Sequence, residues 1–211
     1  MKTRLNIILF LLTTIVVAQE NTHVQPLERT IPATISSAER IAANVYEKAL
    51  PAVVTIFTSS KIPSERGLRQ SGGLGSGVLV SHDCHILTAA HVIAGNSKIL
   101  VKTQDGKMRK ATVLFSEANA DIALLKLEIP DSTLVHARLG DSDKLVVGQN
   151  IYAIGSPYGM ENSFSSGIIS AFRGFNKVYD GTVKVEFLQT DAAINSGNSG
   201  GPIFNLNGKL V

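Results

Sequence analysis

The chain has 211 residues, of which 44% are hydrophobic and 18% charged, a composition that indicates a globular protein and excludes a disordered one. Its formal charge of +3 falls to about +1 without Lys2 and Arg4, and no basic cluster is interleaved with aromatic residues, so nothing indicates a nucleic-acid partner. A single cysteine, Cys84, excludes an internal disulfide, which suits a bacterial export compartment, and we expect it to be a small buried hydrophobe.

The first 18 residues are typical of a secretory signal peptide. Lys2 and Arg4 supply the positive start, an apolar run of 13 residues follows over 5–17, and Ala18 precedes the expected cut. The alternative is a retained membrane anchor, but a span needs about 20 apolar residues. In either case the body of the protein leaves the cytoplasm, so we expect an extracytoplasmic, periplasmic location, with membrane contact only if the segment is retained.

A flexible polar lead-in and one short helix are expected next. Residues 19–37 are polar and contain two prolines, which predicts the lead-in. Ser36 and Glu39 have the spacing of a capping box, and apolar residues then follow at helical spacing. The sequence therefore predicts a helix over 38–50, which Pro51 ends.

Beyond the helix the pattern changes to short β-branched runs separated by turn residues. Residues 60–73 are predicted to form a polar loop, 128–148 are a weak midpoint between two sets of strands, and Asn207-Gly208 is a favoured hairpin turn. This pattern predicts an all-β, antiparallel barrel or sandwich. The predicted strands cover 53–58, 77–80, 86–89, 98–102, 111–115, 122–127, 150–154, 166–171, 183–189, 202–204 and 209–211.

Ser199 lies in a glycine-rich segment that could expose its hydroxyl. Gly197, Gly200 and Gly201 flank it, and glycine permits the positive φ angles that a tight turn needs. Successive N–H groups in such a turn can converge on one point and form an oxyanion hole. On its own, the segment is better explained as an ordinary surface loop, since clusters of Gly, Asn and Ser are typical of turns.

His91 and Asp121 indicate a catalytic site only when they are considered together with Ser199. Taken alone, His91 is a histidine after a β-like run, and Asp121 is a turn residue before a buried strand. A serine hydroxyl is a weak nucleophile until a base accepts its proton, and a neutral imidazole does this near pH 7. A buried carboxylate must then orient the imidazole and stabilise the imidazolium. The three residues, in the order His, Asp, Ser, predict nucleophilic catalysis.

The segments around these residues resemble the protease domain of the HtrA/Deg family, within the trypsin-like clan. The resemblance covers residues 38–211 and is specific in its combination of motifs. The matching segments are 50–54, 75–77, 88–91, 121–125, 153–159, 189–195 and 197–202.

The resemblance implies two perpendicular six-stranded β-barrels with the catalytic triad in the cleft between them. It implies His91 as general base, Asp121 as its orienting acid and Ser199 as nucleophile. The oxyanion hole would lie in the turn 197–199, formed by the N–H groups of Gly197 and Ser199 with Asn198 between them.

The same resemblance implies the substrate class and the assembly. Ile194 matches a position that lines the primary specificity pocket, and such pockets favour small aliphatic residues, so the substrates would be unfolded or damaged envelope proteins. No metal or organic cofactor is implied, and relatives are usually homotrimers or multiples of them.

Two departures from the family pattern affect this interpretation. Ser196 stands where many relatives have proline, and only 12 residues follow Ser199, without the usual C-terminal PDZ domain. We therefore expect the second barrel to be incomplete, with an unpaired strand edge, impaired folding and low activity. The alternative function is an inert fragment or a non-catalytic binding module that keeps the protease fold.

Two further sites are weighed and rejected. The glycine-rich segment 73–77 continues as a strand, whereas a dinucleotide-binding loop opens a helix. The run His-Asp-Cys-His at 82–85 could suggest a metal site, but neighbouring residues on a strand alternate between faces and cannot all converge. A hairpin turn is the better account of that run.

Overall fold

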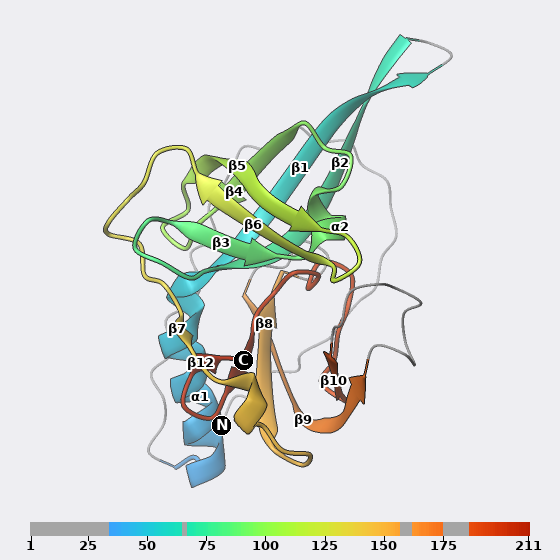
Figure 1. Ribbon diagram of the computed structural model, residues 1–211. Helices are drawn as coiled ribbons and strands as arrows, with labels where there is room; N and C mark the ends of the chain where they lie inside the picture. The colour runs from blue at the N-terminus through green and yellow to red at the C-terminus, as the bar shows by residue number, and fades with distance from the viewer. Residues whose placement is uncertain (1–33, 65–66, 157–161, 175–185) are drawn as a thin grey trace, which may run out of the picture. The chain divides into compact units, whose positions relative to one another are not determined.

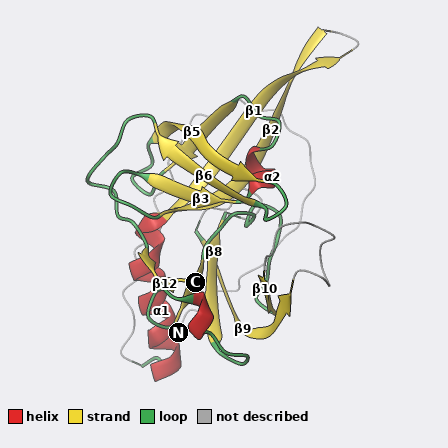
Figure 2. Cartoon of the chain, in the orientation of Figure 1, coloured by secondary structure: helices red, strands yellow, loops and turns green. Residues whose placement is uncertain are grey.

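The computed structural model describes residues 34–64, 67–156, 162–174 and 186–211, and within 61–71 only the backbone (Figure 1). Strands dominate, and a single long helix, α1 (Ser37–Ala49), precedes them (Figure 2). The other elements are, in chain order, η1 (Leu50–Ala52), β1 (Val53–Ser64), β2 (Gly67–Leu79), β3 (His85–Thr88), α2 (Ala90–Ile93), β4 (Lys98–Lys102), β5 (Met108–Glu117), β6 (Ile122–Leu127), β7 (Arg138–Leu139), η2 (Ser142–Lys144), β8 (Asn150–Gly155), β9 (Ser163–Gly174), β10 (Glu186–Thr190), β11 (Ile203–Asn205) and β12 (Lys209–Leu210).

The first six strands close into a barrel in the order β1-β2-β3-β6-β5-β4. Every neighbouring pair is antiparallel. Alternate residues along each strand point inward, as the pleat of a β-strand requires. Closure leaves this sheet without a free edge. The inward side chains that are fully buried include Val54, Ile56, Ile86, Val101 and Leu125.

The remaining strands form a six-stranded sheet in the order β10-β9-β8-β11-β12-β7, which is open over the described residues. Its one parallel pair joins β12 to β7. A separate core of Leu145, Ile151, Ile169 and Ala192 packs on it. The prediction of an all-β architecture is confirmed, with one sheet closed into a barrel and a second sheet that is open over the described residues.

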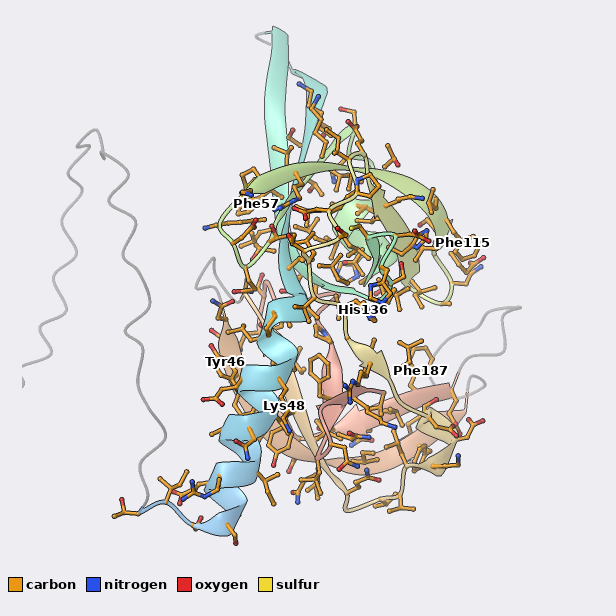
Figure 3. All side chains as sticks on the ribbon, turned by 90° about the vertical axis from the view of Figure 1, so that its left-hand side faces the viewer. Tyr46, Lys48, Phe57, Phe115, His136 and Phe187 are labelled. Carbon is orange, nitrogen blue, oxygen red and sulfur yellow. The ribbon has the colours of Figure 1, made fainter. Side chains whose placement is uncertain are left out.

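Helix α1 covers part of the second sheet. Its N-terminus has the predicted capping box: Ser36 Oγ accepts the N–H of Glu39, and the Glu39 carboxylate accepts the N–H of Ser36. Val45 and Ala49 are buried in a cluster with residues of β8 and β11. Tyr46, labelled in Figure 3, meets the ring of Phe164 edge-on at 5.4 Å. The predicted helix 38–50 is therefore correct to within one residue at each end.

The predicted loop 60–73 is wrong, because most of this segment belongs to β1 and β2. The two strands pair from Val53 opposite Val78 to Ser64 opposite Gly67. An antiparallel ladder is built from main-chain hydrogen bonds, so polar side chains do not interrupt it. Residues 55–59 of β1 also pair with β4, and the base of β2 pairs with β3. The part from Ser60 opposite Ser71 to Ser64 opposite Gly67 forms a two-stranded ribbon beyond the barrel.

Other strand predictions differ in detail. The strands 98–102 and 122–127 match β4 and β6 residue for residue. Apart from β1 and β2, which are longer than predicted by six and ten residues at one end, the others lie within a few residues of their predictions, although 183–185 fall outside the described part of the chain. The turn at Asn207-Gly208 is confirmed by a positive φ of 68° at Gly208. Helix α2 and strand β7 were not predicted, because four and two residues are too few for a periodicity.

The hairpin at 82–85 is confirmed as a turn between β2 and β3. Cys84 is a free, buried cysteine with φ 59°, and its sulfur accepts the N–H of Asp131 over 3.3 Å. His85 Nδ1 lies 2.7 Å from Ser81 Oγ, whereas His82 contacts a different histidine, His136, through the Nε2 atoms at 3.0 Å. The side chains of this run therefore have separate partners.

The predicted signal segment 1–18 and most of the lead-in 19–37 lie outside the described residues. In the part of the chain that is described, no helix has the length and apolar character needed to cross a bilayer.

An ion-pair network connects the β4–β5 turn with the segment after β6. The guanidinium of Arg109, only 12% exposed, donates two bonds of 2.8 Å to the Asp105 carboxylate and one of 2.6 Å to Asp131. It also bonds Thr103 Oγ1. Hydrogen bonds from Arg109 lower the pKa of Asp105, and bonds from Thr133 and Arg109 lower the pKa of Asp131 to about 2. Both carboxylates are therefore stabilised in their charged form.

Removing Arg109 should change how stability depends on pH. Because both carboxyl pKa values are lower in the folded than in the unfolded chain, their stabilising contribution is complete above the ordinary value of 3.8 and is lost as the pH falls towards about 2. We expect Arg109→Met to lower the thermal unfolding midpoint at pH 7 by about 3–6 °C and to flatten the fall in stability below about pH 4. Circular dichroism melts over pH 2–7 measure both.

Lys144→Met is the matched control for Arg109→Met. It removes a pair with Asp141 of 2.7 Å whose side chains are mostly exposed, and such pairs contribute little. If both variants melt at the same temperature as the unaltered chain throughout the pH range, the Arg109 network does not stabilise the fold.

Candidate active site

His91 and Asp121 meet at one end of the barrel. His91 lies in α2, directly after β3, and Asp121 lies in the turn between β5 and β6. His91 Nδ1 is 2.7 Å from Asp121 Oδ2, and the main-chain N–H of His91 donates to Oδ1 over 2.9 Å. One carboxylate thus holds both the ring and the backbone of His91. In the neutral ring this bond keeps the proton on Nδ1, so Nε2 has a free lone pair.

Two features of Asp121 are not evident from the sequence, namely its backbone conformation and the exposure of its side chain. Its φ is +50°, a left-handed conformation that aspartate tolerates better than most side chains. Its side chain is 41% exposed rather than buried. The exposure arises because Asp121 borders an open cavity of about 470 Å³, whose other walls include Ile122, Leu139 and Leu210.

The segment that carries Ser199 is a tight turn, as the glycines predict. Gly197 has φ +101° and Gly200 has φ +77°. A Cβ at Gly200 would collide with Thr88 Oγ1 and with neighbouring main-chain atoms, so the turn requires glycine there for space as well as for conformation. The Gly201 N–H closes the turn by donating to Asn198 O over 2.8 Å.

The three residues predicted for the oxyanion hole are not equivalent. The N–H of Asn198 donates to Asn195 O over 3.0 Å. The N–H groups of Gly197 and Ser199 donate to no described residue. Of these three amide groups, only that of Asn198 has a hydrogen-bond partner among the described residues.

His91 and Ser199 line the same cavity of about 470 Å³, together with Gly197 and Ser196. Over the described residues, no hydrogen bond joins the side chains of His91 and Ser199, and catalytic hydrogen bonds are often long or poorly aligned without substrate. Ile194 is 58% exposed and does not line this cavity. Its assignment to a specificity pocket stays a prediction.

Ser76, a buried polar residue, contacts the turn of Ser199, and the sequence alone indicates no role for its side chain. Its N–H donates to Ser199 O and its Oγ donates to Gly197 O, each over 2.8 Å. The signals in the sequence are the glycines on either side of it and the place of 75–77 among the segments that resemble the HtrA/Deg family. Such a pattern does not reveal a contact with residues more than a hundred positions away.

The site brings together an imidazole, a carboxylate and a hydroxyl, which are the groups that acyl transfer by a serine requires. Over the described residues, no group of three or more histidine, cysteine, aspartate or glutamate side chains is placed to hold a metal ion.

Comparison with known proteins gives the family. Residues 75–211 match the family described as trypsin-like peptidase domain. The "Probable periplasmic serine endoprotease DegP-like" of Halomonas elongata is 47% identical over 138 residues, which are 65% of this chain and 28% of that protein. The "Probable periplasmic serine protease do/HhoA-like" of Haemophilus influenzae is 38% identical over 214 residues, covering 87% of this chain and 45% of that protein.

Solved structures agree with these sequence matches. The HtrA-type protease AlgW with a tripeptide is 37% identical with a TM-score of 0.70, covering 81% of this chain and 52% of that chain. AlgW with a decapeptide gives 33% identity and a TM-score of 0.70, with coverage of 81% and 57%. This chain thus spans less than half of either curated relative and somewhat more than half of the solved chains. It belongs to the family of trypsin-like peptidase domains, within the HtrA/Deg group.

Proposed function

We propose that the chain is a serine endopeptidase that cleaves unfolded or damaged proteins of the bacterial envelope. His91 acts as general base, Asp121 orients it, and Ser199 is the nucleophile. The observation that carries the proposal is the pair of hydrogen bonds between Asp121 and His91, with His91 and Ser199 on the wall of one cavity.

In the first half of the reaction, Ser199 Oγ attacks the carbonyl carbon of the scissile peptide. His91 Nε2 takes the hydroxyl proton, and Asp121 stabilises the imidazolium that forms. The negative charge on the former carbonyl oxygen is accepted by the N–H groups of Gly197 and Ser199. His91 then returns the proton to the leaving nitrogen, the C–N bond breaks, and an acyl-enzyme remains on Ser199.

In the second half, water replaces the leaving amine. His91 takes a proton from the water as its oxygen attacks the acyl carbon, and the same amide donors hold the oxyanion. The ester bond to Ser199 breaks, and the proton returns to its oxygen. The carboxylic acid product leaves and the site is restored.

The substrate class and location rest on the relatives. Two relatives carry the word periplasmic in their names, and the solved structures of AlgW hold a tripeptide or a decapeptide. These names support a peptide or protein as the substrate class of this chain. The expected N-terminal signal segment agrees with a periplasmic location.

A second candidate is a non-catalytic binding module with the same fold. Two observations favour it: the side chains of His91 and Ser199 are not hydrogen-bonded, and Asp121 is 41% exposed. The two candidates differ in whether the Ser199 hydroxyl is activated.

Labelling with a fluorophosphonate separates them. We expect the reagent to form a covalent adduct on Ser199, because it reacts with an activated serine and places its oxygen among the amide donors. Mass spectrometry of the labelled peptide identifies the residue. Ser199→Ala should lose the label.

Ser196→Ala is the control, because Ser196 lines the same cavity and should not affect labelling. A folded wild-type chain that takes up no label, or that is labelled at Ser196 instead, would support the binding-module candidate.

A further inference from the structure

A buried hydroxyl lies behind the turn that carries Ser199. Ser76, in β2, is 0% exposed. Its Oγ donates to the carbonyl oxygen of Gly197 over 2.8 Å and accepts the N–H of Ser156 over 2.9 Å. A serine of the first barrel thus contacts both the residue after β8 in the second sheet and the turn before Ser199.

The main chain of Ser76 is bound on both sides as well. Its N–H donates to Ser199 O over 2.8 Å, and its carbonyl accepts the hydroxyl proton of Thr88 over 2.7 Å. Thr88 ends β3, shortly before His91. One residue therefore has hydrogen bonds to the turn of Ser199 and to the strand that leads to His91.

We propose that Ser76 is a positioning residue, whose hydroxyl fixes the peptide plane between Gly197 and Asn198. The carbonyl of this plane bonds Ser76 Oγ, and its N–H bonds Asn195 O. Both ends of the plane are held, so it cannot rotate. The inference rests on the proposed function, because the plane lies between the two amide donors of the oxyanion hole.

The conformational freedom of Gly197 explains why this peptide plane has to be held by hydrogen bonds. Gly197 has φ +101°, and a residue without a Cβ can turn its peptide plane at little steric cost. Rotation of the plane would change the directions of the flanking N–H groups of Gly197 and Ser199. Donors that stabilise a transition state must already point at the position of the oxyanion before the reaction begins.

Ser76→Ala removes this hold while keeping the main-chain bonds of Ser76. The carbonyl of Gly197 and the N–H of Ser156 would be left without partners in buried positions. Thr55→Val is the matched control. Thr55 Oγ1 forms a buried bond of 2.7 Å with Ser156 Oγ, so its loss disturbs the same network without touching the turn of Ser199.

The first test is kinetic. For hydrolysis of a fluorogenic peptide, we expect Ser76→Ala to lower kcat by about 10–100-fold, with KM changed by less than about threefold because the ground-state contacts remain. Affinity for a peptidyl boronic acid, which mimics the transition state at Ser199, should fall in parallel with kcat. Ser76→Thr keeps the hydroxyl and should restore most of the activity, whereas Thr55→Val should lower stability and leave kcat unchanged.

The second test does not depend on catalysis. Hydrogen exchange of the segment 195–201, followed by mass spectrometry, should be faster by about tenfold in Ser76→Ala and unchanged in Thr55→Val. If the wild-type chain shows no turnover but the exchange result holds, the proposed function fails while the role of Ser76 in holding the turn stands. If Ser76→Ala does not fold, Ser76→Cys replaces it, because the cysteine side chain has a similar shape and a weaker hydrogen-bond donor. The loss of kcat and the faster exchange should then have the same direction and a smaller size.

The inference is overturned if Ser76→Ala matches the wild type in kcat and boronic-acid affinity, or if exchange at 195–201 does not change. It is also overturned if Thr55→Val lowers kcat as much as Ser76→Ala does, because the effect would then be general destabilisation.

Discussion

Ser199→Ala should reduce peptide hydrolysis by about 10⁴–10⁶-fold, because it removes the atom that forms the acyl-enzyme in the proposed mechanism. The glycine conformations of the turn do not depend on the hydroxyl, so the variant should fold as the wild type does. Hydrolysis of unfolded casein or of a fluorogenic peptide measures the loss. Thermal unfolding checks that the fold is kept.

The same reasoning predicts the behaviour of the double variant. If Ser199 and His91 act as one unit, His91→Ala should cost about as much as Ser199→Ala, and the two together no more than either alone. Ser196→Ala, in the same cavity, should keep activity within about twofold, because the mechanism gives it no step. Additive losses would mean that another residue activates Ser199.

Asp121→Asn should have the second largest effect, about a 10³–10⁴-fold loss of kcat near pH 7. In the wild type the main-chain N–H of His91 donates to Oδ1 of Asp121. In Asp121→Asn this N–H needs an acceptor, so the amide oxygen of the asparagine takes the place of Oδ1. The amide NH₂ then takes the place of Oδ2, which lies 2.7 Å from His91 Nδ1 in the wild type. An NH₂ group can only donate a hydrogen bond, so Nδ1 must accept it. That arrangement moves the ring proton to Nε2, and His91 can no longer accept the proton of Ser199.

Kinetics and fluorophosphonate labelling at pH 7 measure this effect. Asp83→Asn, at an exposed turn, is the control and should leave activity unchanged. An activity of Asp121→Asn within about tenfold of the wild type would mean that His91 takes its tautomer from another partner.

The fold could be predicted from the sequence to the extent that its signals are local. The capping box at Ser36 and the short apolar runs of β4 and β6 are read from neighbouring residues, and the structure agrees with them. The ribbon of β1 and β2 was missed because main-chain pairing over polar residues leaves no apolar alternation. Strand β7 exists only because it pairs with a partner some seventy residues away.

In the candidate site, too, the local features could be predicted from the sequence and the long-range contacts could not. His91, Asp121 and Ser199 could be named from short motifs, and the structure brings His91 and Asp121 into contact. The exposure of Asp121 could not be foreseen, since it depends on which distant residues surround the carboxylate. The contacts of Ser76 were hidden for the same reason, because they join segments far apart in the chain.

The two-stranded ribbon has a consequence for local stability next to the site. A two-stranded β-hairpin is only marginally stable in water, whereas a closed barrel opens cooperatively and at much higher free energy. Ser60 and Gly72 lie at the root of the ribbon, and both line the cavity of His91 and Ser199. One wall of the cavity therefore belongs to a segment that opens at low energy, while the base and its carboxylate are mounted on the rigid barrel.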